Sequence, residues 1–525
     1  MKEHAILGID IGTTSVKVVA FDFGGKTLAQ ASTSYDLFHP RPGFSEQDPM
    51  SIRQATFSCI KTVAASVQAL QLQIEALSFS AVMHSVMAVT DDGEVLTPLI
   101  TWADNRSAPE MDRIRADLGL AVYKRTGTPL HPMSPLAKIA WLKTHRADLF
   151  RPGVRFVSIK EWIVYVLCGI WRVDHSTASA TGMFNLASLA FDQEALQYNG
   201  LSADQLSEPV DTLTMMPLHD SDLARALGLT VNLPVVIGAT DGVLANLGTG
   251  VIAAGQVAVT MGTSGAVRIT ASEPWTDDLG RTFCYALTKD YWVIGGAVNN
   301  GGIATRWLTE MLTGNDKSAF AAAGARADSA ALGGRGDHAF GEADESWLFH
   351  MASKVPAGAG GLLFLPYLTG ERAPYFHEHA RGVFFGFGVE HTREHMARAA
   401  VEGIVYALYN VGVVISERHA VQSLHVSGGF ARSKLWRSLV CNIFGVPLQV
   451  PSVDEVSCFG AALLGLHALG EFSSLQDAAK LIVMRDGEQP NGDDAKTYQK
   501  YYPLFASVYE NLKDSFDVLA RMRDL

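Results

Sequence analysis

The chain has 525 residues, 48% of them hydrophobic, and a formal net charge of −12 from 42 basic and 54 acidic residues. A chain of this length is too long for one hydrophobic core, so at least two domains are expected. The acidic balance, without a basic tract, argues against nucleic acid or an anionic membrane as partner and favours a small molecule.

The cysteines and the start of the chain indicate the compartment. Five cysteines, an odd number without paired spacing, are typical of reduced thiols, and no zinc-ligand spacing occurs. A strand begins almost at the first residue, without a basic region and apolar stretch before it, and no apolar run approaches the length that spans a bilayer. We therefore expect a cytoplasmic protein without a membrane partner.

The first half begins with strands and one helix. Short apolar or alternating runs predict four strands, over residues 6–10, 16–23, 27–35 and 74–80. Between the third and fourth, Asp48 and Pro49 predict a helix to Leu70, with the acid as N-cap and proline at the first position. Three antiparallel strands followed by helix and strand resemble the ribonuclease-H-like half of actin-like ATPases.

The second half begins near residue 245, which predicts domains over residues 1–245 and 246–525. A buried strand at 234–239 and an apolar helix precede this boundary. Further strands are predicted over 256–260, 267–270, 282–287, 291–295 and 424–427, the first four in a meander. Helices are predicted over 392–418, 433–444, 459–469 and 494–522. Segment 321–341, rich in glycine and alanine, is interpreted as a surface excursion.

Two motifs 250 residues apart have the composition of phosphate-binding loops. Residues 10–15 and 260–265 each follow a strand and combine glycine, which allows close backbone approach, with hydroxyls and N–H groups that can face phosphate oxygens. One such turn is weak evidence, whereas a pair suggests a nucleotide held between duplicated domains. The candidate phosphate contacts are Gly12, Thr13, Thr14, Lys17, Gly262 and Thr263.

Two aspartates at strand ends are candidates for metal binding and proton transfer. Asp10 can hold a hydrated Mg²⁺ ion, which takes only one or two carboxylates. Asp241 is either the N-cap of a helix or a base that accepts a proton from a substrate hydroxyl during attack on the terminal phosphate of ATP. Spacing alone leaves both interpretations open.

Polar side chains around two further loops are typical of sugar binding. Met83 and His84 follow the strand at 74–80, and Trp102, Asp104 and Arg106 follow them, supplying planar polar groups and an aromatic face. The alternative is structural, since Asp104 to Arg106 could cap the next helix and His84 could be a buried histidine with satisfied hydrogen bonds.

Glycine pairs at strand ends are candidates for the surface that contacts a bound nucleotide. Gly428 and Gly429 leave a flat surface on which an adenine ring could lie, although a plain strand-to-helix turn is equally compatible. Residues 295–302 form a second such patch. Two other motifs are interpreted as decoys: residues 25–27 lack the glycine of a Walker loop, and the Arg-Gly-Asp at 335–337 is a solvated loop.

Two long segments resemble the signatures of the FGGY carbohydrate kinases. Residues 133–145 fit the first signature at every constrained position, and residues 382–402 fit the second, except that Phe387 replaces a smaller aliphatic side chain. The resemblance extends from about Ile6 to Leu469.

This resemblance implies two α/β ribonuclease-H-like domains of the actin and hexokinase type, with ATP and the sugar in a cleft between them. It assigns Asp10 to Mg²⁺, Asp241 to the general base, and the two loops to the phosphates. The implied nucleoside positions are Gly302, Arg306, Gly428, Gly429 and Ser433. The implied sugar positions are Met83, His84, Trp102, Asp104, Arg106 and Asp241.

Within the family, three segments look most like gluconate kinases: Met-His followed by Ser85, residues 101–107, and residues 427–433. A sugar acid would favour a cation, or a cluster of amide and imidazole donors, facing its carboxylate, and His84 and Arg106 could supply these groups. Xylulose kinase, or another pentose or polyol kinase, is the nearest alternative. An actin-like ATPase that drives a protein partner is the alternative from another class, although it needs no sugar-reading loop. Assembly into a homo-oligomer is left open.

Overall fold

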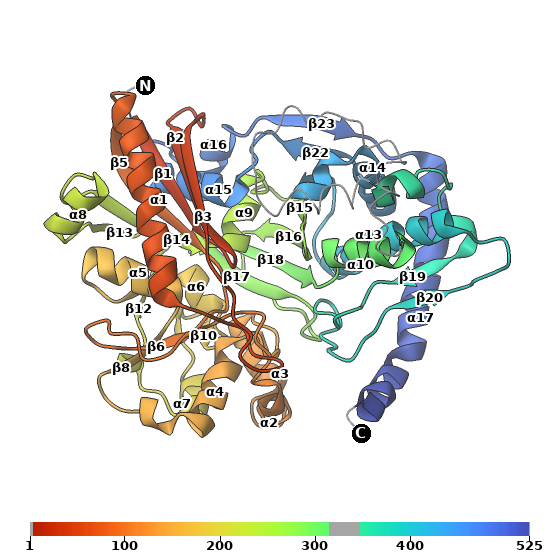
Figure 1. Ribbon diagram of the computed structural model, residues 1–525, viewed down its shortest axis with the longest axis horizontal. Helices are drawn as coiled ribbons and strands as arrows, with labels where there is room; N and C mark the ends of the chain where they lie inside the picture. The colour runs from red at the N-terminus through yellow and green to blue at the C-terminus, as the bar shows by residue number, and fades with distance from the viewer. Residues whose placement is uncertain (1–3, 314–346, 524–525) are drawn as a thin grey trace. The chain divides into compact units, whose positions relative to one another are not determined.

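The computed structural model describes residues 4–313 and 347–523 (Figure 1). The chain divides into two compact units, each built from three segments. The first comprises Met1–Ala254, Ile269–Ile294 and Ser452–Val483, and the second Gly255–Arg268, Gly295–Pro451 and Met484–Leu525. The boundary expected at residue 245 is a single division along the chain and stays a prediction. Segments 321–341 and 335–337 lie outside the described residues.

The first unit is built on a six-stranded sheet in the order β13-β14-β5-β1-β2-β3. Its strands are β1 (His4–Ile11), β2 (Ser15–Asp22), β3 (Thr27–Ser34), β5 (Gln73–Ala81), β13 (Met215–Pro217) and β14 (Pro234–Thr240). The strands β1, β5 and β14 are parallel, whereas β2, β3 and β13 are each antiparallel to a neighbour. All five strands predicted for this half are confirmed, and residues 25–27 lie at the β2–β3 turn, as expected.

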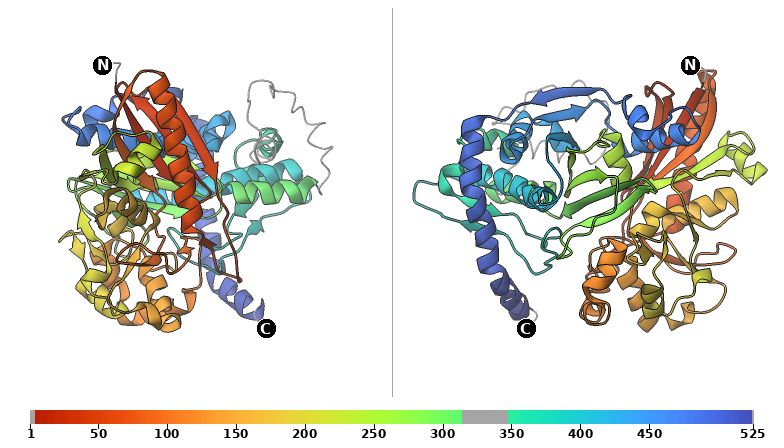
Figure 2. Two further views of the ribbon diagram at one scale, coloured as in Figure 1. Left: turned by 60° about the vertical axis from the view of Figure 1, so that its left-hand side comes forward. Right: turned by 180° about the vertical axis from the view of Figure 1, so that it is seen from behind.

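Helix α1 (Pro49–Ala69) covers one face of this sheet (Figure 2). Its buried Ile60 and Val63 share one hydrophobic cluster with Leu7 and Ile9 of β1. The predicted N-cap is confirmed, because the Asp48 carboxylate accepts the N–H groups of two first-turn residues. Helices α5 (Ile159–Cys168) and α8 (Ser221–Leu227) contribute to the same cluster.

The opposite face is covered by α9 (Asp241–Gly248) and α15 (Val456–Ala468). The helix expected at 459–469 forms and was assigned to the second half of the chain; in the structure it packs on the first sheet. Its small residues allow close packing on the first sheet: a Cβ on Gly8 would lie 2.1 Å from the carbonyl oxygen of Cys458, and Ser78 Oγ donates to the carbonyl oxygen of Ala461 at 2.6 Å. Helix α16 (Leu475–Ala479) belongs to the same unit.

The rest of the first unit consists of short elements, most of them between β5 and β14. The strands are β4 (Glu46–Gln47), β6 (Met87–Thr90), β7 (Leu99–Ile100), β8 (Val154–Val157), β9 (Arg172–Asp174), β10 (Phe184–Asn185), β11 (Ala190–Phe191) and β12 (Glu208–Val210). The helices are α2 (Met111–Asp117), α3 (Gly119–Thr126), α4 (Pro135–His145), α6 (His175–Ser179) and α7 (Gln193–Asn199). A separate hydrophobic cluster under α4 gives this region its own core.

The second sheet repeats the strand order of the first in six of its seven strands, and β17 adds a further edge strand. It runs β17-β18-β16-β15-β21-β22-β23, with β15 (Gln256–Met261), β16 (Gly265–Ala271), β17 (Phe283–Thr288), β18 (Tyr291–Val298), β21 (Ser423–Ser427), β22 (Leu448–Pro451) and β23 (Met484–Glu488). As in the first sheet, the central strands β15, β21 and β22 are parallel. The predicted strands are confirmed, but their meander order was wrong, because β18 rather than β17 lies beside β16.

The second unit contains α10 (Gly302–Thr313), α13 (Arg393–Ser416), α14 (Lys434–Phe444), α17 (Gly492–Arg523) and the hairpin of β19 (Leu363–Leu365) with β20 (Val383–Phe385). Among the described residues, α13 is the one helix long and apolar enough to cross a bilayer, and 83% of its most apolar window is buried, as in a core helix. An apolar stretch of this length was not expected from the sequence, in which no uninterrupted apolar run of that length was identified.

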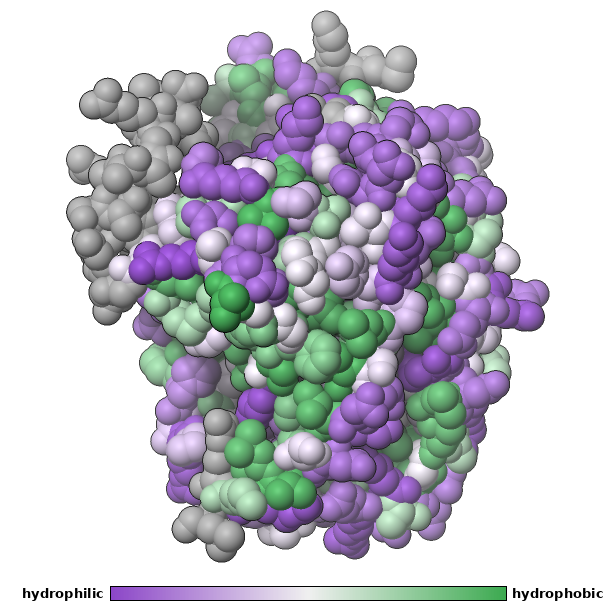
Figure 3. Space-filling model, turned by 90° about the vertical axis from the view of Figure 1, so that its right-hand side faces the viewer, coloured by the Kyte–Doolittle hydropathy of each residue, from purple (hydrophilic) through white to green (hydrophobic). Residues whose placement is uncertain are grey.

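Hydrophobic side chains gather on the face shown in Figure 3. Within the second unit, Trp307, Met311 and Phe387 are among the exposed large hydrophobic residues. The ring of Phe387 lies 5.7 Å from that of Phe384. The departure from the family signature at Phe387 therefore lies at the surface, where a larger side chain does not disturb the core.

Candidate active site

The carboxyl ends of the parallel strands β1, β5 and β14 meet at one edge of the first sheet and bring the two predicted aspartates to it. Asp10 is the penultimate residue of β1 and lies opposite Ser80 of β5, whose Oγ donates to Asp10 Oδ1 at 2.6 Å. Asp241 directly follows β14. Burial, and then the charge of Asp241, raise the pKa of Asp10 to about 7. The two carboxylates therefore act electrostatically on each other.

Asp241 is the first residue of α9 rather than its N-cap. Thr240 holds the N-cap position with extended backbone angles, and its N–H and hydroxyl contact Ser176 Oγ at 3.2 and 3.0 Å. The carboxylate of Asp241 accepts the N–H of Gly242 at 2.7 Å, at the helix end where the dipole favours negative charge. The capping interpretation of Asp241 was therefore wrong.

The first phosphate-type loop, residues 12–14, is fixed through its carbonyl and hydroxyl groups. Tyr35 donates its hydroxyl to the carbonyl oxygen of Gly12, and Gln47 donates to that of Thr13, both at 2.5 Å. Trp102 Nε1 donates to Thr13 Oγ1 at 2.9 Å. A predicted sugar-binding residue is thus hydrogen-bonded to a predicted phosphate-binding residue, which sequence spacing could not show.

Lys17 lies outside this loop, on β2, opposite Asp10. Its ammonium group donates to both carboxylate oxygens of Glu455, at 2.7 and 2.9 Å. We expected Lys17 to add positive charge to the phosphate loop; in the structure, Glu455 already matches this charge. Glu455, at the N-cap of α15, was missed because it is 438 residues away along the chain.

His84 occupies a strained position in the loop after β5, with φ of 62°. The side chain is buried; Nδ1 donates to the carbonyl oxygen of Ala180 at 2.7 Å, and Nε2 lies 3.2 Å from the hydroxyl of Tyr285. The neighbouring Met83 is half-buried. Strain of this kind persists only where the surroundings enforce it, and it is common at binding sites.

Asp104 and Arg106 form a buried ion pair. Arg106 donates through Nε and Nη2 to the two carboxylate oxygens of Asp104 at 2.9 and 2.8 Å, and Nη2 also reaches Glu46 at 2.6 Å. The guanidinium lies 4.0 Å from the centre of the Phe44 ring. We expected Arg106 to offer its charge to a substrate carboxylate, but two protein carboxylates already neutralise it. Asp104 instead accepts the N–H of Ser45, so it does not cap the next helix.

Lys138 of α4 contacts the backbone of the His84 loop, and it was not among the predicted site residues. The side chain is buried, and Nζ donates to the carbonyl oxygens of His84 and Met133, both at 2.7 Å. Burial lowers the pKa of Lys138 to about 7. The signal was present, because Lys138 lies within the first signature segment, but a lysine on an apolar helix does not reveal its acceptors.

We predict that Lys138→Met lowers the free energy of unfolding by about 1–3 kcal/mol, because two buried carbonyl groups lose their donor. It should also raise the KM for the sugar more than it lowers kcat, since the His84 loop loosens. Urea unfolding and steady-state kinetics measure the two effects. Lys143→Met, an exposed lysine of the same helix, is the matched control. Equal effects of the two variants would contradict this role for Lys138.

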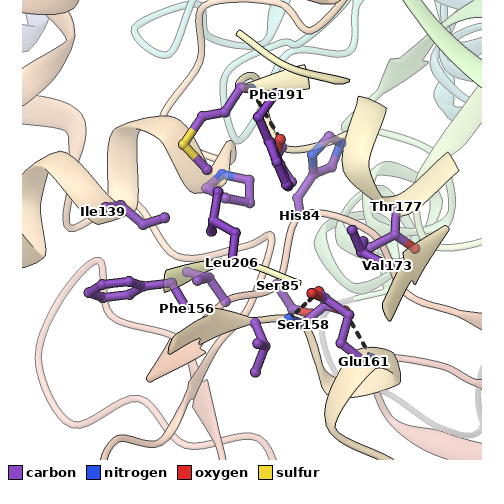
Figure 4. Close-up of a pocket in the computed structure, with 15 residues that line it drawn as sticks. His84, Ser85, Ile139, Phe156, Ser158, Glu161, Val173, Thr177, Phe191 and Leu206 are labelled. Carbon is purple, nitrogen blue, oxygen red and sulfur yellow. Dashed lines mark hydrogen bonds between the residues drawn. The ribbon is translucent and has the colours of Figure 1, made fainter. Parts of the chain in front are cut away.

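A small cavity lies behind the His84 loop (Figure 4). Ser85, Ser158 and Glu161 are among its lining residues, and the Ser85 hydroxyl has no hydrogen-bond partner among the described residues. Burial raises the pKa of Glu161 to about 7. The cavity volume is about 20 Å³, which is enough for about one water molecule but not for a sugar.

In the second unit, the loop at residues 262–264 connects β15 to β16, as residues 12–14 connect β1 to β2. The N–H of Gly302 donates to the carbonyl oxygen of Gly262 at 2.8 Å, and that of Gly301 to Thr263 at 3.1 Å. The start of α10 thus fixes the second loop. Gly262 and Thr263 are exposed.

The remaining predicted nucleoside residues differ in their surroundings. Gly428 has φ of 90°, and a Cβ there would lie 2.1 Å from the carbonyl oxygen of Met261, so glycine is required. Gly429 is exposed, with nothing within 4 Å of an added Cβ. Arg306 is exposed on α10, and Ser433 caps α14 by accepting the N–H of Trp436.

Known structures share this duplicated fold over nearly the whole chain. A ligand-bound xylulose kinase from Lactobacillus acidophilus matches with a TM-score of 0.90 and 31% identity, covering 98% of this chain and 100% of that chain. A gluconate kinase from the same organism matches with a TM-score of 0.89 and 31% identity, covering 98% and 99%. The fold is that of the two-domain α/β sugar kinases.

Sequence comparison identifies the family. Residues 5–248 match the N-terminal domain of the FGGY family of carbohydrate kinases, and residues 257–469 match its C-terminal domain. The gluconokinase of Bacillus subtilis (strain 168) is 41% identical over 518 residues, covering 98% of this chain and 97% of the relative. The chain belongs to the FGGY family of carbohydrate kinases.

Proposed function

We propose that the protein transfers the γ-phosphoryl group of ATP to D-gluconate and forms 6-phospho-D-gluconate and ADP. The observation that carries this substrate assignment is the 41% identity to the Bacillus subtilis gluconokinase over 98% of the chain. The structural similarity does not distinguish gluconate from xylulose as the substrate, because the gluconate kinase and the xylulose kinase are both 31% identical to this chain. Xylulose is therefore the second candidate.

Asp241 is proposed as the general base. Its carboxylate accepts the proton of the attacking sugar hydroxyl while that oxygen bonds to the γ-phosphorus. The bond from the γ-phosphorus to its bridging oxygen breaks, and ADP leaves with that electron pair. Support comes from the position of Asp241 beside Asp10, at the end of β14. Proton transfer of this kind contributes roughly 10²–10⁴-fold to the rate.

Asp10 is proposed to hold Mg²⁺. The donor set fits, because Mg²⁺ prefers carboxylate oxygen and the mutual repulsion of Asp10 and Asp241, which raises the pKa of Asp10, is relieved by a cation. When bound, the ion neutralises charge on the transferred phosphoryl group. The chain itself holds the carboxylate in place through Ser80.

The two loops are each proposed to bind nucleotide phosphates. In the first unit these are Gly12, Thr13 and Thr14, with Lys17 behind them; in the second, Gly262 and Thr263. The proposed nucleoside contacts are Gly302, Arg306, Gly428, Gly429 and Ser433. Support comes from the half-buried Gly12 and the exposed Gly262, on loops whose backbone is fixed by hydrogen bonds, since a preformed loop binds phosphate without an ordering cost.

The proposed sugar contacts are Met83, His84, Trp102, Asp104 and Arg106. The pairing of Asp104 with Arg106 indicates that these two act together, by holding their loop in shape. We also propose that the enzyme works in the cytoplasm. All five cysteines are free and buried, which agrees with a reducing compartment.

A coupled ADP-release assay tests the substrate. The protein, ATP and Mg²⁺ are combined with D-gluconate, D-xylulose, L-ribulose, glycerol or L-fuculose, and with no sugar. We expect kcat/KM for gluconate to exceed the others by at least about tenfold, equivalent to about 1.4 kcal/mol of transition-state binding. Preference for xylulose would keep the kinase chemistry and overturn the substrate. ADP release indifferent to every sugar would favour an ATPase that serves a protein partner.

A further inference from the structure

Two histidines and an aspartate of the second unit point their ligating atoms at one another. His377 and His379 lie on the segment between β19 and β20, and Asp517 lies on α17, beside which this segment passes (Figure 1). The distances to Asp517 Oδ1 are 3.0 Å from His377 Nε2 and 2.9 Å from His379 Nδ1. All three ligating atoms lie within 4.8 Å of one another.

The spacing suits a metal ion of the zinc type. Zinc binds imidazole nitrogen and carboxylate oxygen at about 2.0–2.2 Å in a tetrahedron, which places ligand atoms about 3.3 Å apart. Two nitrogen donors favour zinc and its transition-metal neighbours over Mg²⁺ and Ca²⁺, which prefer all-oxygen sites. Three protein ligands leave a fourth position for water.

The surroundings of the histidines also allow the required protonation states. Without metal, each imidazole donates a proton to Asp517 Oδ1. On metal binding, each neutral imidazole carries its proton on the opposite nitrogen. For His377 this is Nδ1, which lies 3.0 Å from the hydroxyl of Tyr509. For His379 it is Nε2, on a side chain that is 43% exposed to solvent. Partners of this kind orient metal-binding histidines in many proteins.

We propose that His377, His379 and Asp517 form a binding site for a divalent transition-metal ion such as Zn²⁺. The site is separate from the carboxylates Asp10 and Asp241, which belong to the first unit, and does not depend on the identity of the sugar. The ion ties the C-terminal helix to the segment between β19 and β20.

The same segment carries Glu371, which contacts the part of the second unit proposed above to bind the nucleotide. Glu371 accepts the N–H of Asn299 at 2.6 Å, and Asn300 donates to the carbonyl oxygen of Gly370 at 2.8 Å. Asn299 and Asn300 are separated by only Gly301 from the start of α10, which fixes the second phosphate-type loop. Metal binding at the histidines therefore stabilises the chain that supports this loop.

Titration of the full-length, metal-stripped protein with Zn²⁺ by calorimetry, and with Co²⁺ by visible absorption, tests the proposal. We expect one equivalent per chain, a Co²⁺ spectrum typical of tetrahedral coordination, and a thermal midpoint that rises with Zn²⁺ but not with Mg²⁺. His379→Ala and Asp517→Asn should each weaken Zn²⁺ binding at least 100-fold. Tyr509→Phe, which removes only the partner of His377, should weaken it about 10-fold.

His395→Ala is the matched control, because His395 is another partly exposed histidine of the second unit whose ring lies 5.3 Å from that of His391. It should leave binding unchanged. The proposal is overturned if the wild-type protein takes up no stoichiometric Zn²⁺, or if His379→Ala and Asp517→Asn bind as the wild type does. It is also overturned if His395→Ala abolishes binding. Circular dichroism verifies that each variant is folded.

Discussion

Asp241→Asn is expected to lower kcat for sugar phosphorylation by about 10²–10⁴-fold, with little change in the KM for ATP. Asparagine has nearly the same size but cannot accept the proton of the attacking hydroxyl. The fold should tolerate the change, because Thr240 rather than Asp241 is the N-cap of α9. The amide oxygen of asparagine can still accept the N–H of Gly242. Steady-state and single-turnover kinetics measure the loss.

Asp290→Asn provides the control for Asp241→Asn. Asp290 is an exposed residue in the turn between β17 and β18, and its replacement should leave kcat within about twofold. Turnover near the wild-type value in folded Asp241→Asn would remove Asp241 from the role of general base. A lower unfolding midpoint that accounts for the lost activity would do the same.

Asp10→Asn should lower kcat by about 10²–10³-fold, the usual scale for losing one preorganised electrostatic contact in an active site. It should also make the metal-free protein more stable at high pH. The pKa of Asp10 is raised from 3.8 to about 7, so the folded state binds its proton more tightly than the unfolded state. Stability therefore falls as pH rises from about 4 to about 7. Asparagine does not ionise and avoids that loss.

Urea unfolding of the metal-free proteins at pH 5 and pH 8 measures this difference. The stabilisation by Asp10→Asn should grow with pH and reach on the order of 4 kcal/mol at pH 8. Asp290→Asn again serves as the control and should show no such trend. A stability difference independent of pH would mean that the pKa of Asp10 is not raised, and unchanged kcat would remove Asp10 from the active site.

The strands and long helices could be predicted because local signals define them. The apolar runs of β1 and β14, and the Asp48-Pro49 start of α1, need no distant partner to be recognised. The segment between β5 and β14 was not resolved into elements, because its strands are two to four residues long and such runs carry little periodicity. The β16-β18 pairing and the position of α15 depend on contacts between residues that are distant in sequence. Hydrophobic periodicity does not reveal such contacts.

At the candidate site, residue types could be predicted but not their partners. The sequence indicated Asp10 and Asp241 because acids at the ends of parallel strands meet at one edge of a sheet. It did not indicate that Arg106 is neutralised by Asp104 and Glu46, or that Lys17 is bound to Glu455. Sequence alone does not show which charged side chains are paired. Tertiary packing determines which opposite charge lies close enough to pair with each of them.

The late position of α15 has a consequence for synthesis. The first unit needs the segment Ser452–Val483, which leaves the ribosome about 200 residues after Ala254. Synthesis proceeds at roughly 5–20 residues per second, so the face of the first sheet around Gly8 stays without α15 for roughly 10–40 s. During that interval we expect the growing chain to be prone to aggregation, and a product terminated before Ser452 would keep that face exposed. Translation speed through the second unit thus bears directly on the yield of the folded enzyme.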